Sequence, residues 1–175
     1  MLKNNWLTIK KTHPQLYALA EFYHWQKVVS YLFLAKKQAI LFDTGMGYGK
    51  IKQAVQSVTR LPVKVFLTHT HWDHIHGIPF FIPLFIPGNE FDFYTPIEDF
   101  QERLYAQQEF KYFPVSMDKH MPAIKRFHTI EVGKEYNLPN FKLKVLDQNH
   151  PGGSFAYRIE AEGKVFIYST DVEFN

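Results

Sequence analysis

The chain has 175 residues, a length typical of one domain and too short for two ordinary ones. Its 46% hydrophobic and 21% charged residues match soluble globular proteins, so we expect a single domain with an apolar core over residues 1–175. The net charge of +3 comes from scattered Lys and Arg residues and does not argue for nucleic-acid binding. Because the chain has no cysteine, disulfides are excluded and any zinc site must use histidine and carboxylate ligands.

The N-terminal segment lacks an apolar core of signal-peptide length. The longest apolar runs, such as Val28–Ala35, are far too short to span a membrane. We therefore expect a cytoplasmic protein with no membrane contact.

The first part of the chain predicts strands followed by a helix. Apolar runs predict strands at Leu16–Phe22, Val28–Leu34 and Ala39–Phe42. Apolar residues then repeat at helical spacing over residues 51–58, which predicts a helix with one apolar face. The short run Val63–Leu67 predicts a buried strand.

The later part predicts a loop, a helix and more strands. Three prolines within Ile78–Gly88 exclude a regular helix or central strand, so we expect an apolar loop there. Thr95-Pro96-Ile97-Glu98 fits a capping box and predicts a helix to about Phe110. Further strands are predicted near Phe127–Val132, Phe141–Leu146, Phe155–Glu160 and Val165–Tyr168, with turns at Asn137–Asn140 and Glu162-Gly163. These elements favour an α/β architecture with more than one sheet.

A dense group of histidines follows the predicted strand Val63–Leu67, in the stretch Thr-His-Thr-His-Trp-Asp-His-Ile-His-Gly. In an extended segment alternate residues share a side, so His69, His71 and Asp73 should project together. His74 can turn to the same cavity if the backbone bends there. Imidazole and carboxylate are ligands that zinc, iron and manganese accept, so the spacing predicts a metal site rather than a histidine-rich surface loop.

The spacing His69-x-His71-x-Asp73-His74 resembles the His-x-His-x-Asp-His motif of the metallo-β-lactamase superfamily. An earlier stretch, Asp43-Thr44-Gly45 at a strand end, resembles the Asp-x-Gly element that supports the metal loop in that superfamily. The resemblance implies an α/β fold of the metallo-β-lactamase type, an αβ/βα sandwich in which two mixed β-sheets are flanked by helices.

Two later stretches agree with the same resemblance. His150, in a His-Pro-Gly-Gly-Ser sequence, resembles the third histidine of the superfamily, and Asp171, after Ser-Thr, resembles its bridging aspartate. The resemblance implies one or two divalent ions, with zinc preferred and manganese or iron as alternatives. The implied ligands are His69, His71 and His150 for one ion, Asp73 and His74 for the other, and Asp171 between them.

The residues within and after the motifs narrow the resemblance to one group of the superfamily. His-Trp-Asp-His followed by Gly-Ile-Pro-Phe-Phe, and later His-Pro-Gly-Gly-Ser-Phe-Ala-Tyr-Arg, is similar to the ribonuclease Z-like phosphodiesterase group. This group implies a metal-dependent hydrolase of small-molecule or nucleotide phosphodiesters or cyclic phosphates. It also implies that Asp73 passes a proton to the leaving alkoxide. Further expected substrate or supporting contacts are His76, Gly152, Gly153, Ser154 and Asp43.

Two other functions stay open. Residues 40–47, Ile-Leu-Phe-Asp-Thr-Gly-Met-Gly, are equally typical of the glyoxalase II-like and lactonase branches, which implies thioester or lactone hydrolysis. The superfamily also supplies one more histidine to the second ion, from a segment beyond the bridging aspartate. The sequence stops at Asn175, so a metal-binding but inactive truncated domain is the third possibility.

The same observation predicts a domain without the last strands and helix of the fold. Three explanations are open: a fragment of a longer protein, a short form whose second ion is held by Asp73, His74, Asp171 and water, or a partner chain that completes the sheet and site. The apolar group Phe80, Phe81 and Phe85 favours an interface, so a homodimer is a further expectation. Trp72 is expected to pack.

Overall fold

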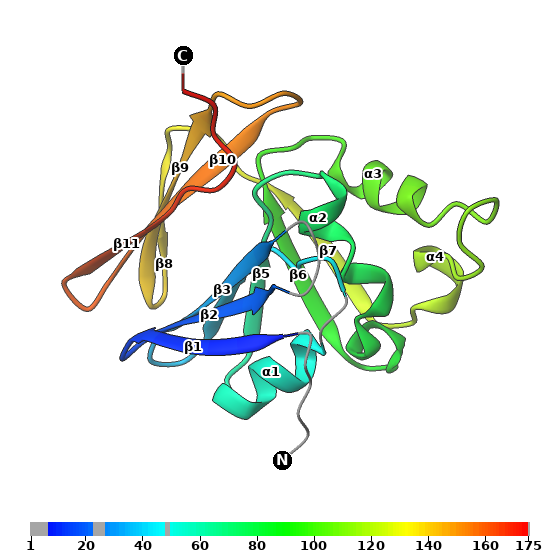
Figure 1. Ribbon diagram of the computed structural model, residues 1–175, viewed down its shortest axis with the longest axis horizontal. Helices are drawn as coiled ribbons and strands as arrows, with labels where there is room; N and C mark the ends of the chain where they lie inside the picture. The colour runs from blue at the N-terminus through cyan, green and yellow to red at the C-terminus, as the bar shows by residue number, and fades with distance from the viewer. Residues whose placement is uncertain (1–6, 23–26, 48–49, 175) are drawn as a thin grey trace.

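The computed structural model describes residues 7–22, 27–47 and 50–174. Within them, seven strands form one sheet in the order of the chain (Figure 1). The first four strands pair antiparallel with one another. The fourth to the seventh strands pair parallel. The strands are β1 (Thr8–His13), β2 (Leu16–Glu21), β3 (Val28–Leu34), β4 (Ala39–Phe42), β5 (Val63–Phe66), β6 (Glu90–Thr95) and β7 (Ile124–Thr129).

A second sheet of four antiparallel strands packs against the first, in the order β11-β10-β9-β8. Its strands are β8 (Glu135–Leu138), β9 (Phe141–Gln148), β10 (Ser154–Ala161) and β11 (Lys164–Tyr168). Helices lie along the first sheet, on the side away from the second (Figure 1). They are α1 (Ile51–Val58), α2 (Trp72–Ile75), α3 (Phe100–Gln107) and α4 (Met117–His120), with 3₁₀ turns at Ile78–Phe80 and Ile82–Phe85. No helix in the described part of the chain is long and apolar enough to cross a membrane.

Strand β4 shows why these layers form. Side chains alternate between the two faces of a strand, and all four residues of β4 are apolar and buried. Ala39 and Leu41 belong to the core under the helices, whereas Ile40 and Phe42 belong to the core between the sheets. A strand that is apolar on both faces is stable only between two layers, so this sequence places β4 at the centre of the molecule.

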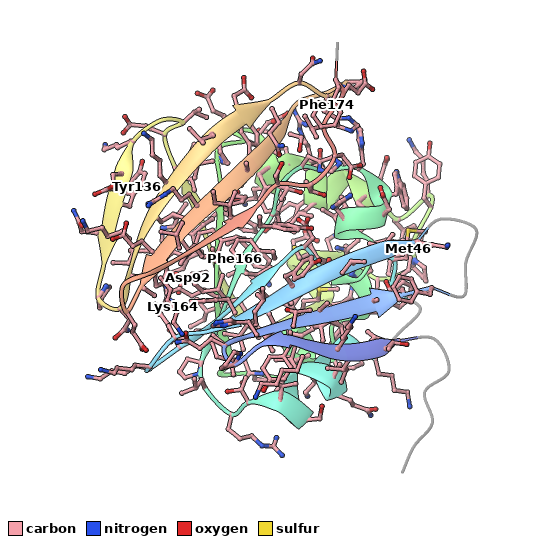
Figure 2. All side chains as sticks on the ribbon, turned by 60° about the vertical axis from the view of Figure 1, so that its left-hand side comes forward. Met46, Asp92, Tyr136, Lys164, Phe166 and Phe174 are labelled. Carbon is pink, nitrogen blue, oxygen red and sulfur yellow. The ribbon has the colours of Figure 1, made fainter. Side chains whose placement is uncertain are left out.

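Aromatic rings fill much of the space between the sheets. Phe42 is fully buried, and its ring lies 5.1 Å from that of Tyr168 and 5.7 Å from that of Tyr157. Phe166 of β11 stacks on Phe33 of β3, and it points inward from its strand (Figure 2). These contacts hold β10 and β11 against the first sheet, and so fix the loops that follow them.

The predicted α/β architecture with two sheets is confirmed. The sequence reading missed the strands Thr8–His13, Glu90–Thr95 and Glu135–Leu138 and the short helix Met117–His120. The expected turn at Asn137–Asn140 is shorter, because β8 runs to Leu138 before the chain reverses.

The helix expected after Thr95 begins later, at Phe100. The capping box does not form, because the Thr95 hydroxyl accepts a hydrogen bond from the amide of Ile97 and no side-chain cap is made at Asp99. In the proline-rich segment the absence of a regular helix or strand is confirmed, but the loop contains two 3₁₀ turns, each with proline in its first turn.

Candidate metal centre

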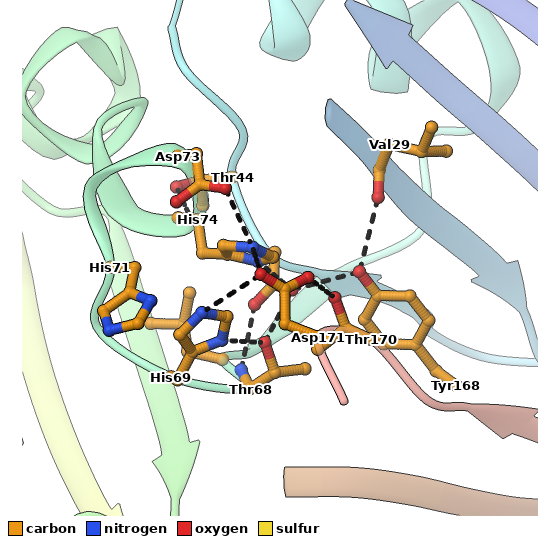
Figure 3. A network of polar contacts seen from close by, with 12 residues as sticks. Val29, Thr44, Thr68, His69, His71, Asp73, His74, Tyr168, Thr170 and Asp171 are labelled. Carbon is orange, nitrogen blue, oxygen red and sulfur yellow. Dashed lines mark hydrogen bonds and ion pairs between the residues drawn. The ribbon is translucent and has the colours of Figure 1, made fainter. Parts of the chain in front are cut away.

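Four segments bring the candidate ligands together at one end of the molecule. His69 and His71 follow β5, and Asp73 and His74 lie in α2. His150 lies between β9 and β10, and Asp171 follows β11. Parallel strands end at the same edge of a sheet, and the packing of the second sheet brings its own loops to that edge. Residues far apart in the sequence therefore meet in one network (Figure 3).

Three histidines form the first cluster. Donor atoms of His69, His71 and His150 all lie within 4.8 Å of one another. Nδ1 of His71 and Nε2 of His150 are 3.3 Å apart. Zinc binds imidazole nitrogen at about 2.0–2.1 Å in tetrahedral sites, which places two such nitrogens about 3.3 Å apart. The three rings are thus close to the arrangement that one divalent ion requires.

The second cluster joins His74 to two carboxylates. Its Nε2 lies 3.3 Å from Oδ2 of Asp73 and 3.6 Å from Oδ2 of Asp171. The same Asp171 oxygen lies 3.8 Å from Nε2 of His69 and 3.9 Å from Nε2 of His150. Asp171 therefore stands between the two clusters, where a bridging ligand is expected.

Asp43 organises the loop from beneath the clusters. It is fully buried and accepts four hydrogen bonds, from the amide and hydroxyl of Thr68 at 2.9 Å each, from Nδ1 of His74 at 2.9 Å and from the hydroxyl of Tyr168 at 3.1 Å. Its backbone φ is +56°, a conformation that aspartate adopts more readily than most residues. Asp43 supports the candidate ligands, as the resemblance implies, and is in neither ligand cluster.

Hydrogen bonding fixes which nitrogen of His69 is free. The Thr68 hydroxyl gives its proton to Asp43, so it accepts a hydrogen bond from Nδ1 of His69 at 3.0 Å. Nε2 of His69 is then an unprotonated acceptor, and within the described residues it is buried without a hydrogen-bond partner. Burial, followed by the charge of nearby His74, lowers the pKa of His69 to about 4. A neutral imidazole with a buried lone pair is what a metal ion requires.

The field around His74 favours positive charge. Burial of this histidine opposes its protonation, but contacts with Asp171, Asp43 and Asp73 outweigh that effect. Together they raise the pKa of His74 to about 12. The same imidazolium holds the pKa of Asp171 well below its usual range, although burial opposes the shift. Several carboxylates converging on one buried point stabilise a cation there, and a divalent ion meets that requirement with the donor set present.

One feature of the metal loop differs from the prediction. The backbone is extended only through His71, and Asp73 lies in α2 rather than in an extended segment. His71 occupies the N-cap position with φ −66° and ψ 151°. The helical turn brings Asp73 and His74 round to the cluster, so alternation along a strand is the wrong reason for their proximity.

The remaining predicted residues lie around the centre. His76 is in neither ligand cluster, and its ring lies between those of Trp72 and Phe80. Gly152 has φ +82°, a backbone conformation that favours glycine, and a Cβ atom there would meet Nε2 of His71 at an ordinary contact distance of 3.4 Å. Gly153 follows with φ +83°, and the Ser154 side chain is buried with no hydrogen-bond partner among the described residues.

Sequence reasoning missed two residues that hold the network. Thr68 and Tyr168 both donate to Asp43, and neither was selected from its type or spacing. A usable signal was present: Thr68 directly precedes the first histidine, and Tyr168 ends the strand that leads to Asp171. Polar residues at strand ends beside a ligand are candidates for such support.

Residues 38–174 match the family model described as the beta-lactamase superfamily domain, and the chain belongs to this family. The chain is 25% identical over 137 residues to a curated protein of Bacillus subtilis described as the probable metallo-hydrolase YqgX. That match covers 75% of this chain, and it spans 60% of the length of the relative. The superfamily named from the sequence motifs is thereby confirmed.

Solved structures confirm the fold. The human tRNase Z short form aligns with a TM-score of 0.58 at 15% identity, over 92% of this chain and 67% of that chain. A diphosphatase of the PhnP family aligns with a TM-score of 0.54 at 22% identity, over 74% and 48%. A metallo-β-lactamase of Cronobacter sakazakii aligns with a TM-score of 0.63 at 16% identity, over 93% and 64%. Proteins with different substrates thus share this architecture, and the fold alone does not name the reaction.

Proposed function

We propose that this chain is the metal-binding part of a metal-dependent hydrolase that acts on a phosphodiester or a cyclic phosphate. The observation that carries the proposal is the position of Asp171 Oδ2, within 4 Å of His69, His74 and His150. The residues around His74 and His150, which are similar to those of the ribonuclease Z-like phosphodiesterase group, support phosphorus over other electrophiles. Zinc is the ion that this donor set favours, with manganese and iron as alternatives.

His69, His71 and His150 would hold one ion, His74 and Asp73 a second, and Asp171 would be shared. Donor atoms of His69, His74 and Asp171 lie within 4.8 Å of one another, and Asp73 meets this group at Nε2 of His74, 3.3 Å away. Such ions, when bound, lower the pKa of water from about 15.7 towards 7 and stabilise charge on phosphoryl oxygens.

The surrounding residues orient these groups and move a proton. Asp43 and Thr68 fix the tautomers of His74 and His69, so that both present Nε2 to the centre. The side chain of Asp73 is 15% exposed, and although burial opposes the shift, its contact with His74 lowers the pKa of the Asp73 carboxyl group. As a carboxylate it would take up a proton released by the attacking water and pass it to the departing alkoxide. The backbone at Gly152 borders the exposed side of His71 and would lie close to a bound substrate oxygen, whereas the amide of Gly153 donates to the carbonyl of His150 at 2.9 Å.

The first test is the metal content of the protein purified without chelator. We expect about two ions per chain in the wild type, by the ligand count of the two clusters. Asp171→Ala removes the shared ligand and should lower the content of both ions, whereas Asp147→Ala, at an exposed aspartate of β9, should leave it unchanged. One ion or fewer in the wild type would contradict the two-ion assignment.

The second test is turnover by the metal-loaded protein. Hydrolysis of bis(p-nitrophenyl) phosphate, a cyclic nucleotide or a cyclic ribose phosphate, lost in Asp171→Ala, is the expected result. Turnover of S-lactoylglutathione or an acyl lactone, with the phosphodiesters untouched, would replace the proposal by thioester or lactone hydrolysis. Tight metal binding without any turnover would point to an inactive metal-binding domain.

A further inference from the structure

A hollow of about 500 Å³ lies beside the metal loop, on the face of α2 that carries Trp72 and Ile75. It is lined from one side by Thr70, Trp72 and Ile75 and from the other by α3 and the segment after it. Thr70 and Trp72 each adjoin a candidate ligand in the sequence, so the hollow and the metal loop share their backbone. The full lining is Thr70, Trp72, Ile75, Arg103, Ala106, Gln107 and Tyr112.

Two aromatic rings of the lining are largely exposed. Trp72 is 59% exposed and Tyr112 is 77% exposed. The sequence predicted a packing role for Trp72, but its one ring contact among the described residues is an edge contact with His76 at 5.3 Å. Single exposed rings are common on protein surfaces, but two that line one hollow together form an apolar surface of the kind that marks a binding site.

A guanidinium group lies in the same hollow. Arg103 donates from Nη1 to the Thr70 hydroxyl at 3.0 Å and from Nε to the Asp99 carboxylate at 2.8 Å. These bonds orient its plane, while Nη2 has no hydrogen-bond partner among the residues that the structure describes. The hollow therefore combines stacking surface with a positioned donor.

We propose that this hollow is a subsite for the base of a nucleotide whose phosphate lies at the metal centre. The inference rests on the function proposed above and names its substrate class. Planar bases stack on aromatic side chains, and arginine donates to their polar edges. A sugar phosphate offers no planar face, so it would leave both rings in water.

The test measures binding of adenosine 5′-monophosphate and ribose 5-phosphate to the metal-loaded full chain by calorimetry. The two probes differ only in the base, and both are monoesters, so binding is read without turnover of a diester. Stacking contributes about 1–3 kcal/mol per base, so we expect the nucleotide to bind about tenfold tighter. Trp72→Ala and Tyr112→Ala should each remove most of that preference while ribose 5-phosphate binds as before.

A matched control is available in Phe110, which is 79% exposed, lies two residues from Tyr112 and is outside the lining. Phe110→Ala should leave the preference intact, and Trp72→Phe should restore part of it. Equal affinity of the wild type for the two probes would overturn the subsite, as would equal effects of Phe110→Ala and Tyr112→Ala.

The two proposals fail in different ways. If the protein hydrolyses bis(p-nitrophenyl) phosphate but shows no preference for the nucleotide, the subsite is wrong and the hydrolase stands. If the nucleotide preference depends on Trp72 and Tyr112 but no phosphodiester is cleaved, the subsite stands and the hydrolase proposal is wrong.

Discussion

At the scale of single residues, Asp43 holds parts of the candidate site together from beneath. Its two oxygens accept from Thr68, His74 and Tyr168, groups that belong to three different segments. Asp43→Asn replaces one acceptor by an NH₂ donor that faces donors. We expect metal affinity to fall about 10- to 100-fold, the usual effect of losing a partner of a ligating histidine. Stability should fall by about 1–3 kcal/mol, because buried donors lose their acceptor.

Metal content after dialysis against a weak chelator measures the first effect of Asp43→Asn, and urea unfolding measures the second. Asp147→Asn makes the same chemical change at an exposed aspartate and should alter neither. If Asp43→Asn bound metal as tightly as the wild type, Asp43 would not support the ligands in the way the network indicates.

At the scale of elements, the loop after β4 packs closely against helix α2 and the glycine that follows it. Thr44 donates to the carbonyl of His74 at 2.9 Å through both its amide and its hydroxyl, and Gly77 donates to the carbonyl of Gly45 at 3.0 Å. A Cβ atom on Gly77 would lie 2.2 Å from the carbonyl oxygen of Thr44. The φ of Gly77 is −69°, so glycine is required here by the close approach and not by the backbone angle.

Gly77→Ala should therefore push α2 away from the loop and disturb Asp73 and His74. We expect a loss of about 1–3 kcal/mol of stability, typical of overpacking, together with reduced metal content. Gly163→Ala is the control, because that residue has φ +70° and open space around its Cβ position. It should cost about 1–2 kcal/mol through backbone strain and leave metal content unchanged. Full metal content in a folded Gly77→Ala variant would show that α2 tolerates the shift.

The elements that the sequence predicted share a visible pattern, and those it missed do not. β4 and β5 are short apolar runs with clear boundaries, and α1 carries an apolar stripe. β1 is exposed along its whole length and has no apolar face to detect. α3 begins four residues after Thr95-Pro96 because tertiary packing, not the capping motif, sets its start. Local sequence patterns therefore predicted the elements that have a buried apolar face of their own. They failed where contacts with neighbouring elements determine whether or where an element forms.

At the scale of the whole molecule, the site depends on how the second sheet docks. Tyr157 of β10 is fully buried, and its hydroxyl donates to the carbonyl of Leu67 at 2.6 Å, at the start of the metal loop. Tyr157→Phe keeps the ring contacts with Phe42 and Phe66 but removes this donor. We expect a loss of about 1–3 kcal/mol in chemical denaturation, with metal bound as before. An unchanged midpoint would mean that ring packing alone joins the sheets here.

The sequence predicted the six candidate ligands because the superfamily motifs are local, each within a few residues. It did not predict their geometry, since His69 and Asp171 are 102 positions apart in the numbering and meet only through the docking of the two sheets. The hollow beside Trp72 could not be predicted from the sequence either, because Arg103 and Tyr112 lie outside every motif. Residue type and spacing predicted which side chains are candidate metal ligands. Where a substrate would bind depends on the surface that these segments form together in the folded chain.

A bound ion should also stabilise the molecule, because the clusters join both sheets and α2. A ligand present at about 100 times its dissociation constant adds about 2.7 kcal/mol, which corresponds to about 5–10 °C in Tm for a domain of this size. Adding zinc to chelator-treated protein should raise Tm by that amount, and Asp171→Ala should lose most of the shift while Asp147→Ala keeps it. An ion that binds the folded state must favour folding by mass action. If the wild-type Tm changed with neither chelator nor zinc, the carboxylates and histidines of this centre would therefore hold no ion in the folded state.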